Sequence, residues 1–271
     1  MPRTRQSEAA VERRRQEILE HVIGRGEVRI DDLTERFGVS LMTIHRDLDD
    51  LDERQLVRKL RGKVEAFPAL TMETATRFRD GLNPAEKEAL AEAAIRQVQS
   101  GQTVFVDDST TLFPLVHKLA EVERLTVITN SLRVARILGP SENAEVLLTG
   151  GRYYSEFDSC IGPDVLAALD RTRADVAFVS VTAVAVGRLF HPVRDYAELK
   201  KAALRSANHN VLVVDHSKFG RTATYAHGLV ADYDLMITDE ATPTEEIEAA
   251  LNSGTAVEVV ECVSEELLYD T

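Results

Sequence analysis

The stretch GVSLMTIHRDL, residues 38–48, decides the first part of the fold because it reads as a turn followed by an amphipathic helix. Ser40 is a typical N-cap residue, and the apolar residues behind it recur at helical spacing. The residues before this stretch predict another helix, which begins at Asp31 as its cap and ends at Gly38. Two helices joined by so short a turn predict a helix-turn-helix, whose second helix enters the major groove of DNA.

The sequence on either side predicts the rest of a winged domain. Upstream, apolar residues along one face predict a helix over about 7–24. Downstream, Leu56–Leu60 and Val64–Phe67 alternate weakly around Arg61-Gly62-Lys63, which is typical of a hairpin. A basic hairpin at this place can hold the flanking DNA backbone electrostatically. We therefore predict a winged helix-turn-helix domain over residues 1–66.

The predicted recognition helix carries its basic and hydroxyl-bearing residues at its start and its acids later. A helix N-terminus favours phosphate, so this polarity suits insertion by the N-terminal end. Arg46 can read guanine, and Thr43 or His45 can contact base edges or phosphate. The residues that we expect at DNA are Arg14, Ser40, Met42, Thr43, His45, Arg46, Arg58, Arg61 and Lys63. From spacing alone, the alternative is a three-helix bundle that binds protein and has a solvated charged face.

Charge is placed unevenly along the 271 residues. The net charge of -13, taken globally, argues against a polyanionic partner. Residues 1–66, however, hold 14 Lys and Arg against 14 Asp and Glu, so the whole negative excess lies in 67–271. Such asymmetry suggests that one end of the chain meets a polyanion, which for this fold is double-stranded DNA.

Several functional classes lack support in the sequence. The two cysteines, Cys160 and Cys262, form no CxxC motif, so we expect neither a disulfide framework nor a zinc site. The seven histidines show no metal-ligand spacing, and we expect no metal and no cofactor. No signal-peptide pattern opens the chain, and no apolar run approaches the ~18 residues of a membrane span. We therefore expect a cytoplasmic protein with no membrane partner.

Residues 83–271 alternate β-rich runs with helical stretches, which predicts an α/β domain with a Rossmann-like, mostly parallel sheet covered on both faces. Asn83-Pro84-Ala85-Glu86 is a helix start with a capping-box pattern, and we expect this helix to run to about Gln99. Residues 67–82 read as a linker, and Val176–Val186 as one buried strand with its continuation. The predicted strands are Val104–Val106, Val127–Ile128, Val146–Leu148, Val176–Val181, Val211–Val214, Leu235–Ile237 and Val257–Val260.

The residues that follow these strands are the candidates for a small-molecule site, because ligands of open α/β sheets bind beyond the carboxyl ends of the strands. Hydroxyls and backbone N–H groups at a helix start can hold an anion, and glycines let the backbone approach a ligand closely. Taken singly, each candidate is more simply a helix cap or a loop residue. Their coincidence at several strand ends predicts a small phosphorylated polyol as the ligand. The candidates are Asp107, Ser109, Thr110, Thr111, Thr129, Asn130, Ser131, Gly150, Gly151, Arg152, Asp215 and Lys218.

Motifs along the whole chain resemble the DeoR family of bacterial transcriptional regulators. The N-terminal ones are Arg14–Ile18 and Val39–Leu48, where the family usually shows Val-Ser-x-x-Thr-Ile-Arg-Arg-Asp-Leu and this chain has His45. The C-terminal ones are Asp107–Thr111, with Ser109 in place of the family glycine, Thr129–Ser131, Gly150-Gly151, Gly162 and Asp215–Gly220. Lys200 matches the helix lysine of the family by its distance from Asp215, which adds it to the effector-binding candidates. Tyr196 replaces the acid usual one turn earlier.

The resemblance implies a sensor domain similar to ribose phosphate isomerase that binds a sugar phosphate or related metabolite. It also implies a homodimer or homotetramer that represses a sugar or polyol catabolic operon until the effector releases it. Two alternatives stay open at this point. One is an isomerase-like enzyme with Asp107, Glu198, Lys200 and Lys218 as acid–base groups. The other is an adaptor whose helices bind a protein partner.

Overall fold

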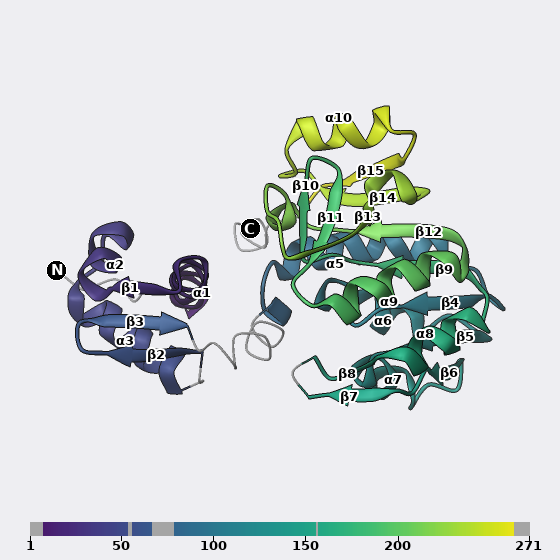
Figure 1. The fold of residues 1–271 in the computed structure, drawn as a ribbon, viewed down its shortest axis with the longest axis horizontal. Helices are drawn as coiled ribbons and strands as arrows, with labels where there is room; N and C mark the ends of the chain where they lie inside the picture. Colours follow the sequence, from purple (N-terminus) through teal and green to yellow (C-terminus); the bar gives the residue numbers. More distant parts are fainter. Residues whose placement is uncertain (1–7, 54–55, 67–78, 156, 263–271) are drawn as a thin grey trace, which may run out of the picture. The chain divides into compact units, whose positions relative to one another are not determined.

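In the computed structural model, the described residues are 8–53, 56–66, 79–155 and 157–262. The chain divides into two compact units, Met1–Leu82 and Asn83–Thr271, and each is considered by itself (Figure 1). Ser7, Phe67 and most of the predicted linker lie outside the described residues.

The first unit is a three-helix domain with a small antiparallel sheet, as the sequence predicted. Its elements are α1 (Glu8–Arg25), β1 (Glu27–Arg29), α2 (Ile30–Phe37), α3 (Leu41–Glu53), β2 (Val57–Leu60) and β3 (Lys63–Ala66). The strands pair in the order β1-β3-β2. Ile18, Leu33, Ile44, Leu48 and Val64 lie in its buried core, so all three helices and the hairpin share one hydrophobic cluster.

The turn between α2 and α3 has the local chemistry that the sequence indicated. Gly38 has a φ of 61°, a conformation that glycine adopts without strain, and its N–H donates to the Thr34 carbonyl at 3.1 Å. Ser40 caps α3, because its Oγ accepts the backbone N–H of Thr43 at 3.2 Å. The recognition helix therefore begins where the sequence placed it.

The start of α2 differs from the prediction. Asp31 was expected to cap this helix, but the N-cap position lies two residues earlier, at Arg29, which forms no side-chain hydrogen bond there, and the helix begins at Ile30. The reason is the short strand β1, which pairs with β3 and leads directly into the helix. Asp31 lies instead in the first turn, where a carboxylate still favours the helix dipole.

Seven parallel strands form the central sheet of the second unit, in the order β15-β14-β12-β9-β4-β5-β6 (Figure 1). The strands are β4 (Thr103–Val106), β5 (Leu125–Thr129), β6 (Ala144–Leu148), β9 (Ala174–Val179), β12 (Ala207–Val213), β14 (Leu235–Asp239) and β15 (Ala256–Val260). Each β-rich run predicted from the sequence is one of them. Successive residues of β4 and β9 are buried, which requires cover on both faces of the sheet. The predicted α/β architecture is confirmed.

Helices supply this cover. They are α5 (Pro84–Ala94), α6 (Phe113–Leu119), α7 (Leu132–Leu138), α8 (Pro163–Asp170), α9 (Arg194–Arg205) and α10 (Thr244–Asn252). α5 contacts β12, β14 and α6, whereas α9 contacts β9, β12 and α8. Short 3₁₀ turns η1 (Ile95–Gln97), η2 (Thr110–Leu112), η3 (His216–Lys218) and η4 (Val230–Asp232) complete the order. α5 is shorter than predicted because the chain tightens into η1 after Ala94.

Two small antiparallel sheets were missed by the sequence analysis. β7 (Arg152–Tyr154) and β8 (Ser159–Ile161) form a hairpin, and β10 (Ala183–Ala185), β11 (Arg188–His191) and β13 (Tyr225–Leu229) form a three-stranded sheet. The predicted strand Val176–Val181 extends too far, because β9 ends at Val179, and the continuation of the run to Val186 contains a separate strand, β10. Both parts are apolar and buried, so hydrophobicity alone did not mark the break.

None of the helices in the described parts of the chain has the length and apolar character needed to cross a membrane.

Candidate functional site

Five polar residues follow five adjacent strands at one edge of the central sheet. Asp107 follows β4, Asn130 follows β5, Thr149 follows β6, Ser180 follows β9 and Asp215 follows β12. Because these strands run parallel, their carboxyl ends meet at the same edge, where α/β proteins bind ligands. We call these five residues the carboxyl-edge cluster.

Asp107 and Lys200 form a buried ion pair at the centre of this edge. Lys200 Nζ donates to Asp107 Oδ2 at 2.6 Å, to the Ser180 carbonyl at 2.8 Å and to Ser109 Oγ at 3.3 Å. The Asp107 carboxylate also accepts the backbone N–H groups of Ser109 at 2.9 Å and Ser180 at 3.2 Å. The lysine side chain is 2% exposed and that of the aspartate 0%. Such saturated bonding fixes both side chains in place.

Asp108, the next residue, lies in a different environment. Burial raises the pKa of its carboxyl group, with a further increase from Asp107 and an opposing effect from Lys200. Ser159 Oγ donates to Asp108 Oδ2 at 2.9 Å and lies 2.7 Å from the Tyr196 hydroxyl. This relay joins the β7–β8 hairpin and α9 to the loop after β4.

Four members of the carboxyl-edge cluster carry a buried polar atom that forms no hydrogen bond with any described residue. These atoms are Asn130 Oδ1, Thr149 Oγ1, Ser180 Oγ and Asp215 Oδ2, none of which has a hydrogen-bond partner among the described residues. An unmet buried hydrogen-bonding group costs ~1–3 kcal/mol, so native proteins leave few of them. Their gathering at one sheet edge is the feature expected of a site that completes its hydrogen bonds with a polar ligand.

The loop after β12 places a second cation beside a buried carboxylate. Lys218 Nζ lies 3.4 Å from Asp215 Oδ2 and 3.1 Å from Ser217 Oγ. Burial alone would raise the pKa of Asp215, but Lys218 and the hydrogen bonds from Ser217 and Asn83 outweigh it, so this pKa lies below its ordinary value. Asp215 is therefore an ionised acceptor at the cluster.

Some predicted effector residues have bonds that the fold alone explains. Ser131 Oγ caps α7 by accepting the Val134 N–H at 3.2 Å, and Thr129 Oγ1 accepts the Ser131 N–H at 3.0 Å. Gly151 has a φ of 100°, and a Cβ there would lie 2.8 Å from a methyl group of Val165. Capping and packing thus account for Thr129, Ser131 and Gly151, and a contact of these residues with effector stays a prediction.

The other predicted effector residues divide by exposure. Thr110 and Thr111 are buried, and Lys87 Nζ, also buried, lies 3.4 Å from Thr110 Oγ1. Gly150 has a φ of 70°, which a glycine adopts readily. Arg152 is exposed, lies 3.7 Å from Asp195 and stacks over the Tyr154 ring. Arg152 can move towards an anion because nothing buries it.

Thr149, Ser180, Ser159 and Tyr196 contribute to this edge but were not among the predicted effector residues. Ser180 could have been found by the rule that found Asp107, since both follow a strand directly. It was overlooked because the predicted strand, Val176–Val181, included it. Ser159 and Tyr196 carry no local signal, because only the fold brings β8 and α9 beside Asp108.

In the first unit, the start of α3 presents several predicted DNA-contacting side chains. Met42 is 66% exposed, although it is apolar, and Arg46 lies one turn further on and is also exposed. His45 and Thr43 are half-buried, and Thr43 Oγ1 lies 2.9 Å from Ser40 Oγ. An exposed methionine and arginine at i and i+4 share one face of the helix.

The remaining predicted DNA contacts are held in ion pairs or lie at the hairpin. Arg14 Nε donates to the buried Asp47 at 2.6 Å, which anchors α1 on α3. Arg58 pairs with Glu65, and Lys63 Nζ lies 2.6 Å from Glu27. Arg61 is exposed at the hairpin turn, whereas Lys63 lies in β3 and not in the turn as the sequence suggested. Contacts of these residues with DNA stay predictions.

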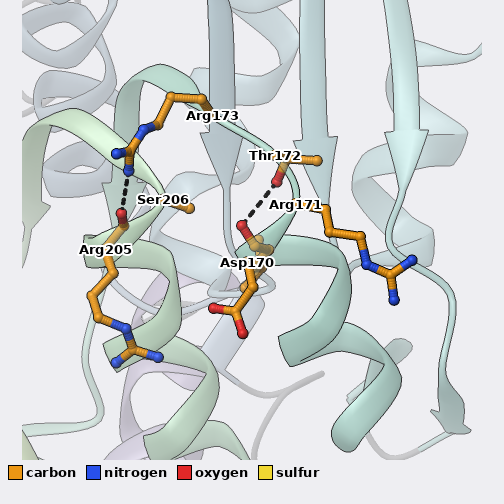
Figure 2. Close-up of a pocket in the computed structure, with 7 residues that line it drawn as sticks. Asp170, Arg171, Thr172, Arg173, Arg205 and Ser206 are labelled. Carbon is orange, nitrogen blue, oxygen red and sulfur yellow. Dashed lines mark hydrogen bonds between the residues drawn. The ribbon is translucent and has the colours of Figure 1, made fainter.

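A separate cavity of about 280 Å³ lies at the opposite edge of the sheet, before β9 and β12. Arg171, Arg173 and Arg205 line it, and Arg173 donates to the carbonyl of Arg205 (Figure 2). Figure 2 shows the side chains of Arg171 and Arg205 pointing away from one another. Because Arg171 and Arg205 diverge and Arg173 is bonded to a helix-end carbonyl, these arginines do not form an anion site, and the carboxyl-edge cluster remains the candidate.

Among residues 8–53, 56–66, 79–155 and 157–262, no group of three or more His, Cys, Asp or Glu side chains could hold a metal ion. The candidate site consists of the polar side chains of the carboxyl edge and of Lys200 and Lys218.

A helix-turn-helix with an exposed reading face, on the same chain as a parallel sheet with unmet polar atoms at its carboxyl edge, defines the class of ligand-responsive DNA-binding regulators. Residues 14–67 match the DeoR-like helix-turn-helix domain, and residues 82–240 match the DeoR C terminal sensor domain. The chain belongs to the DeoR family of transcriptional regulators.

Curated relatives match over nearly their whole length. The glycerol-3-phosphate regulon repressor of Escherichia coli K12 is 33% identical, over 83% of this chain and 90% of that protein. The HTH-type transcriptional repressor CsqR of the same organism is 32% identical, over 85% and 88%. Among solved structures, ribose 5-phosphate isomerase A from Neisseria gonorrhoeae matches with 13% identity and a TM-score of 0.37, over 52% of this chain and 54% of that one. So distant a likeness supports no argument about the site.

Proposed function

We propose that this protein represses a sugar or polyol catabolic operon and leaves its DNA operator when a phosphorylated sugar or polyol binds at the carboxyl-edge cluster. The observation that carries this proposal is the set of four unmet buried polar atoms on Asn130, Thr149, Ser180 and Asp215. Hydroxyl groups of a polyol can both donate and accept, which suits carboxylate, amide and hydroxyl oxygens together.

The charges at the same edge favour an anionic ligand group. Lys218 and Lys200 are held beside the cluster, and Arg152 is exposed nearby in sequence to Thr149. A phosphate can replace some of the present partners of Lys218 and Arg152 through charge-assisted hydrogen bonds. The relative named as a glycerol-3-phosphate regulon repressor supports a small phosphorylated polyol as the ligand class.

The DNA-binding half of the proposal rests on α3. Its exposed Arg46 suits a bidentate contact with guanine, and Met42 suits apolar contact with a thymine methyl group. Arg58, Arg61 and Lys63 of the hairpin are proposed to contact the phosphate backbone. We further propose a homodimer or homotetramer, which would read repeated half-sites with two copies of α3.

The isomerase alternative has less support from the same geometry. A general base must reach a carbon-bound proton with a free oxygen, but the Asp107 carboxylate is already bonded to Lys200, Ser109 and Ser180. Glu198 is half-buried and pairs with Lys201 at 3.2 Å. A turnover assay with pentose and hexose phosphates tests this alternative, and measurable isomerisation would establish it.

The main test is a thermal-shift screen with glycerol 3-phosphate and a panel of pentose and hexose phosphates, followed by DNA binding. A ligand at 100 times its Kd raises stability by about 2.7 kcal/mol through mass action. The operator is first selected from a random duplex library, and its affinity is then measured with and without the best ligand. Ser180→Ala should reduce ligand affinity, whereas Ser253→Ala, which removes a hydroxyl bonded only locally after α10, should not. If no phosphorylated compound alters DNA affinity, the proposal is wrong.

A further inference from the structure

The first residue of the second unit, Asn83, has a backbone conformation that its sequence disfavours. It occupies the N-cap position of α5, where asparagine normally has an extended backbone and accepts a hydrogen bond from the first turn. Instead its φ is 50° and its ψ 51°, and its side chain makes no cap bond. Asparagine adopts the left-handed region more readily than most residues other than glycine, but a following proline such as Pro84 favours extended backbone. The predicted capping box at Asn83 is therefore absent.

The side chain of Asn83 is bonded to the candidate effector site instead. Its Nδ2 donates to Asp215 Oδ1 at 2.9 Å, across 132 residues of sequence. Asp215 is fully buried, and its other oxygen, Oδ2, is among the unmet atoms of the carboxyl-edge cluster. The Asn83 side chain thus contacts a carboxylate whose second oxygen has no hydrogen-bond partner among the described residues and lies only in the 3.4 Å ion pair with Lys218.

The same first turn of α5 is tied to a second loop of the cluster. Lys87, four residues after Asn83 and therefore on the same face of the helix, is 2% exposed. Its Nζ lies 3.4 Å from Thr110 Oγ1, in the loop after β4. The start of α5 consequently contacts the loops after both β12 and β4, on either side of β9 in the sheet.

We propose that Asn83 couples effector binding to the DNA-binding unit by switching between two bonding states. In the state described here, Asn83 is left-handed and bonded to Asp215. In the other state, its backbone is extended and its side chain caps α5 in the ordinary way. A ligand that contacts Asp215 shifts the balance between them, because the first state uses Asn83 Nδ2 as a donor to this carboxylate, whereas the second uses Asn83 Oδ1 as an acceptor and does not need the carboxylate. This inference rests on the proposed function.

The switch acts where the chain leaves the sensor unit for residues 67–82. A change of φ and ψ at Asn83 redirects the chain that precedes α5, since backbone dihedrals at an element terminus absorb hinge motions. The cost of a left-handed backbone before a proline opposes the bond to Asp215, so a ligand contact at Asp215 can reverse the balance between the two states. Asn83 is thus a positioning residue and not a ligand contact.

The test compares three full-length variants with the wild type in effector binding and in DNA binding. Asn83→Gly permits the left-handed backbone but removes the amide. Asn83→Asp caps α5 well but is repelled by Asp215, so it favours the extended state. Asn143→Gly is the matched control, because it removes a side-chain hydrogen bond to Ala120 next to the start of β6. Glycerol 3-phosphate is the first probe, and the best binder of the phosphate panel is the second.

For the wild type, we expect the operator Kd to rise by about 5–150-fold on saturation with the probe, the usual range of allosteric coupling. Asn83→Gly should bind the probe within about 2-fold of the wild type, while its DNA coupling falls below about 2-fold. Asn83→Asp should have weakened DNA affinity before any probe is added. By reciprocity, DNA should no longer alter probe affinity in Asn83→Gly. Asn143→Gly should keep the full wild-type coupling.

The outcomes separate this inference from the proposed function. If the wild type shows no coupling, the proposed function is wrong and this inference falls with it. If the wild type is coupled and both Asn83 variants keep its coupling, only the inference is overturned. A loss of probe affinity above 10-fold in Asn83→Gly would place Asn83 in the binding site and also overturn it. Should Asn83→Gly not fold, Asn83→Asp and hydrogen exchange of residues 79–94 on probe addition decide the same question, with unchanged exchange in the wild type against the proposal.

Discussion

The hairpin of the first unit and the carboxyl edge of the second unit both pair lysine with carboxylate, but in opposite surroundings. Lys63 and Glu27 lie 2.6 Å apart with both side chains 46% exposed, whereas Lys200 and Asp107, at the same distance, are 2% and 0% exposed. An exposed pair contributes about 0–1 kcal/mol and exchanges readily for another anion. A buried pair cannot lose one partner without leaving an uncompensated charge.

This difference suits the two proposed ligands. DNA phosphates arrive from solvent and compete with surface carboxylates for Lys63 and Arg58, at a rate and affinity that depend on salt. A small effector enters an edge whose charged groups are already fixed, so little ordering is needed on binding. The exposed pair at the hairpin can therefore exchange partners, whereas the buried pair at the carboxyl edge holds its side chains in fixed positions.

The largest expected effect comes from breaking the buried pair. Lys200→Met should lower the free energy of unfolding of the second unit by about 3–5 kcal/mol, because the charge of Asp107 remains buried without a partner. Urea unfolding followed by circular dichroism measures this loss. Lys201→Met is the control, since Lys201 forms a more exposed pair with Glu198 and should cost under about 1 kcal/mol. Equal losses in the two variants would remove the distinction drawn above.

The pH dependence of stability provides a second test of burial in the second unit, through His227. His227, in β13, is 1% exposed, neither ring nitrogen has a partner among the described residues, and burial, with help from Lys200 and Lys201, lowers its pKa to about 3. In the unfolded chain this ring binds a proton below its ordinary pKa of ~6.5, whereas in the folded protein it stays neutral until the pH approaches 3. The free energy of unfolding is therefore unaffected by His227 above pH ~6.5 and falls by up to about 1.4 kcal/mol per pH unit as the pH drops towards 3. Unfolding curves at pH 7 and pH 5 should therefore differ.

His227→Leu should flatten that pH dependence, whereas the exposed His117→Leu should leave it unchanged. An unaltered slope in His227→Leu would mean that other groups carry the acid sensitivity.

The reading face of α3 should show an intermediate effect. Arg46→Ala should weaken operator binding by about 1–3 kcal/mol and relax the preference at one base pair, because a base-reading side chain is removed. Selection from a random duplex library with the variant measures both changes. Binding that weakens equally on all sequences would assign Arg46 to phosphate and not to a base.

The smallest effect is expected at the exposed pair. Lys63→Ala should change the free energy of unfolding by less than about 1 kcal/mol and weaken DNA binding uniformly across sequences. The slope of log affinity against log salt should fall by about 1, as for the loss of one phosphate contact. Anisotropy titrations at several salt concentrations provide the measurement, and an unchanged slope would show that Lys63 stays with Glu27 in the complex.

Much of the second unit could be predicted from the sequence because its strands and helices depend on patterns of neighbouring residues. Each strand of a doubly covered parallel sheet is a continuous apolar run, and the start of α7 carries a side-chain cap, Ser131. Polar residues such as Asp107 and Asp215 could be named as candidates because strand direction fixes the edge at which they gather. The break after Val179 and the hairpin β7–β8 were missed because their residues are as apolar or as mixed as those of ordinary strands.

The sequence by itself determined the two-part architecture, the recognition helix and the edge of the sheet where polar side chains collect, since periodicity, caps and strand direction are properties of neighbouring residues. Only the tertiary structure decided which of those side chains are already satisfied. In the folded chain the Asn83 amide donates to Asp215 instead of capping α5, and Lys200 pairs with Asp107. Ser180 Oγ has no hydrogen-bond partner among the described residues. Partners that lie 93 and 132 residues apart are chosen by packing, and no local pattern encodes that choice.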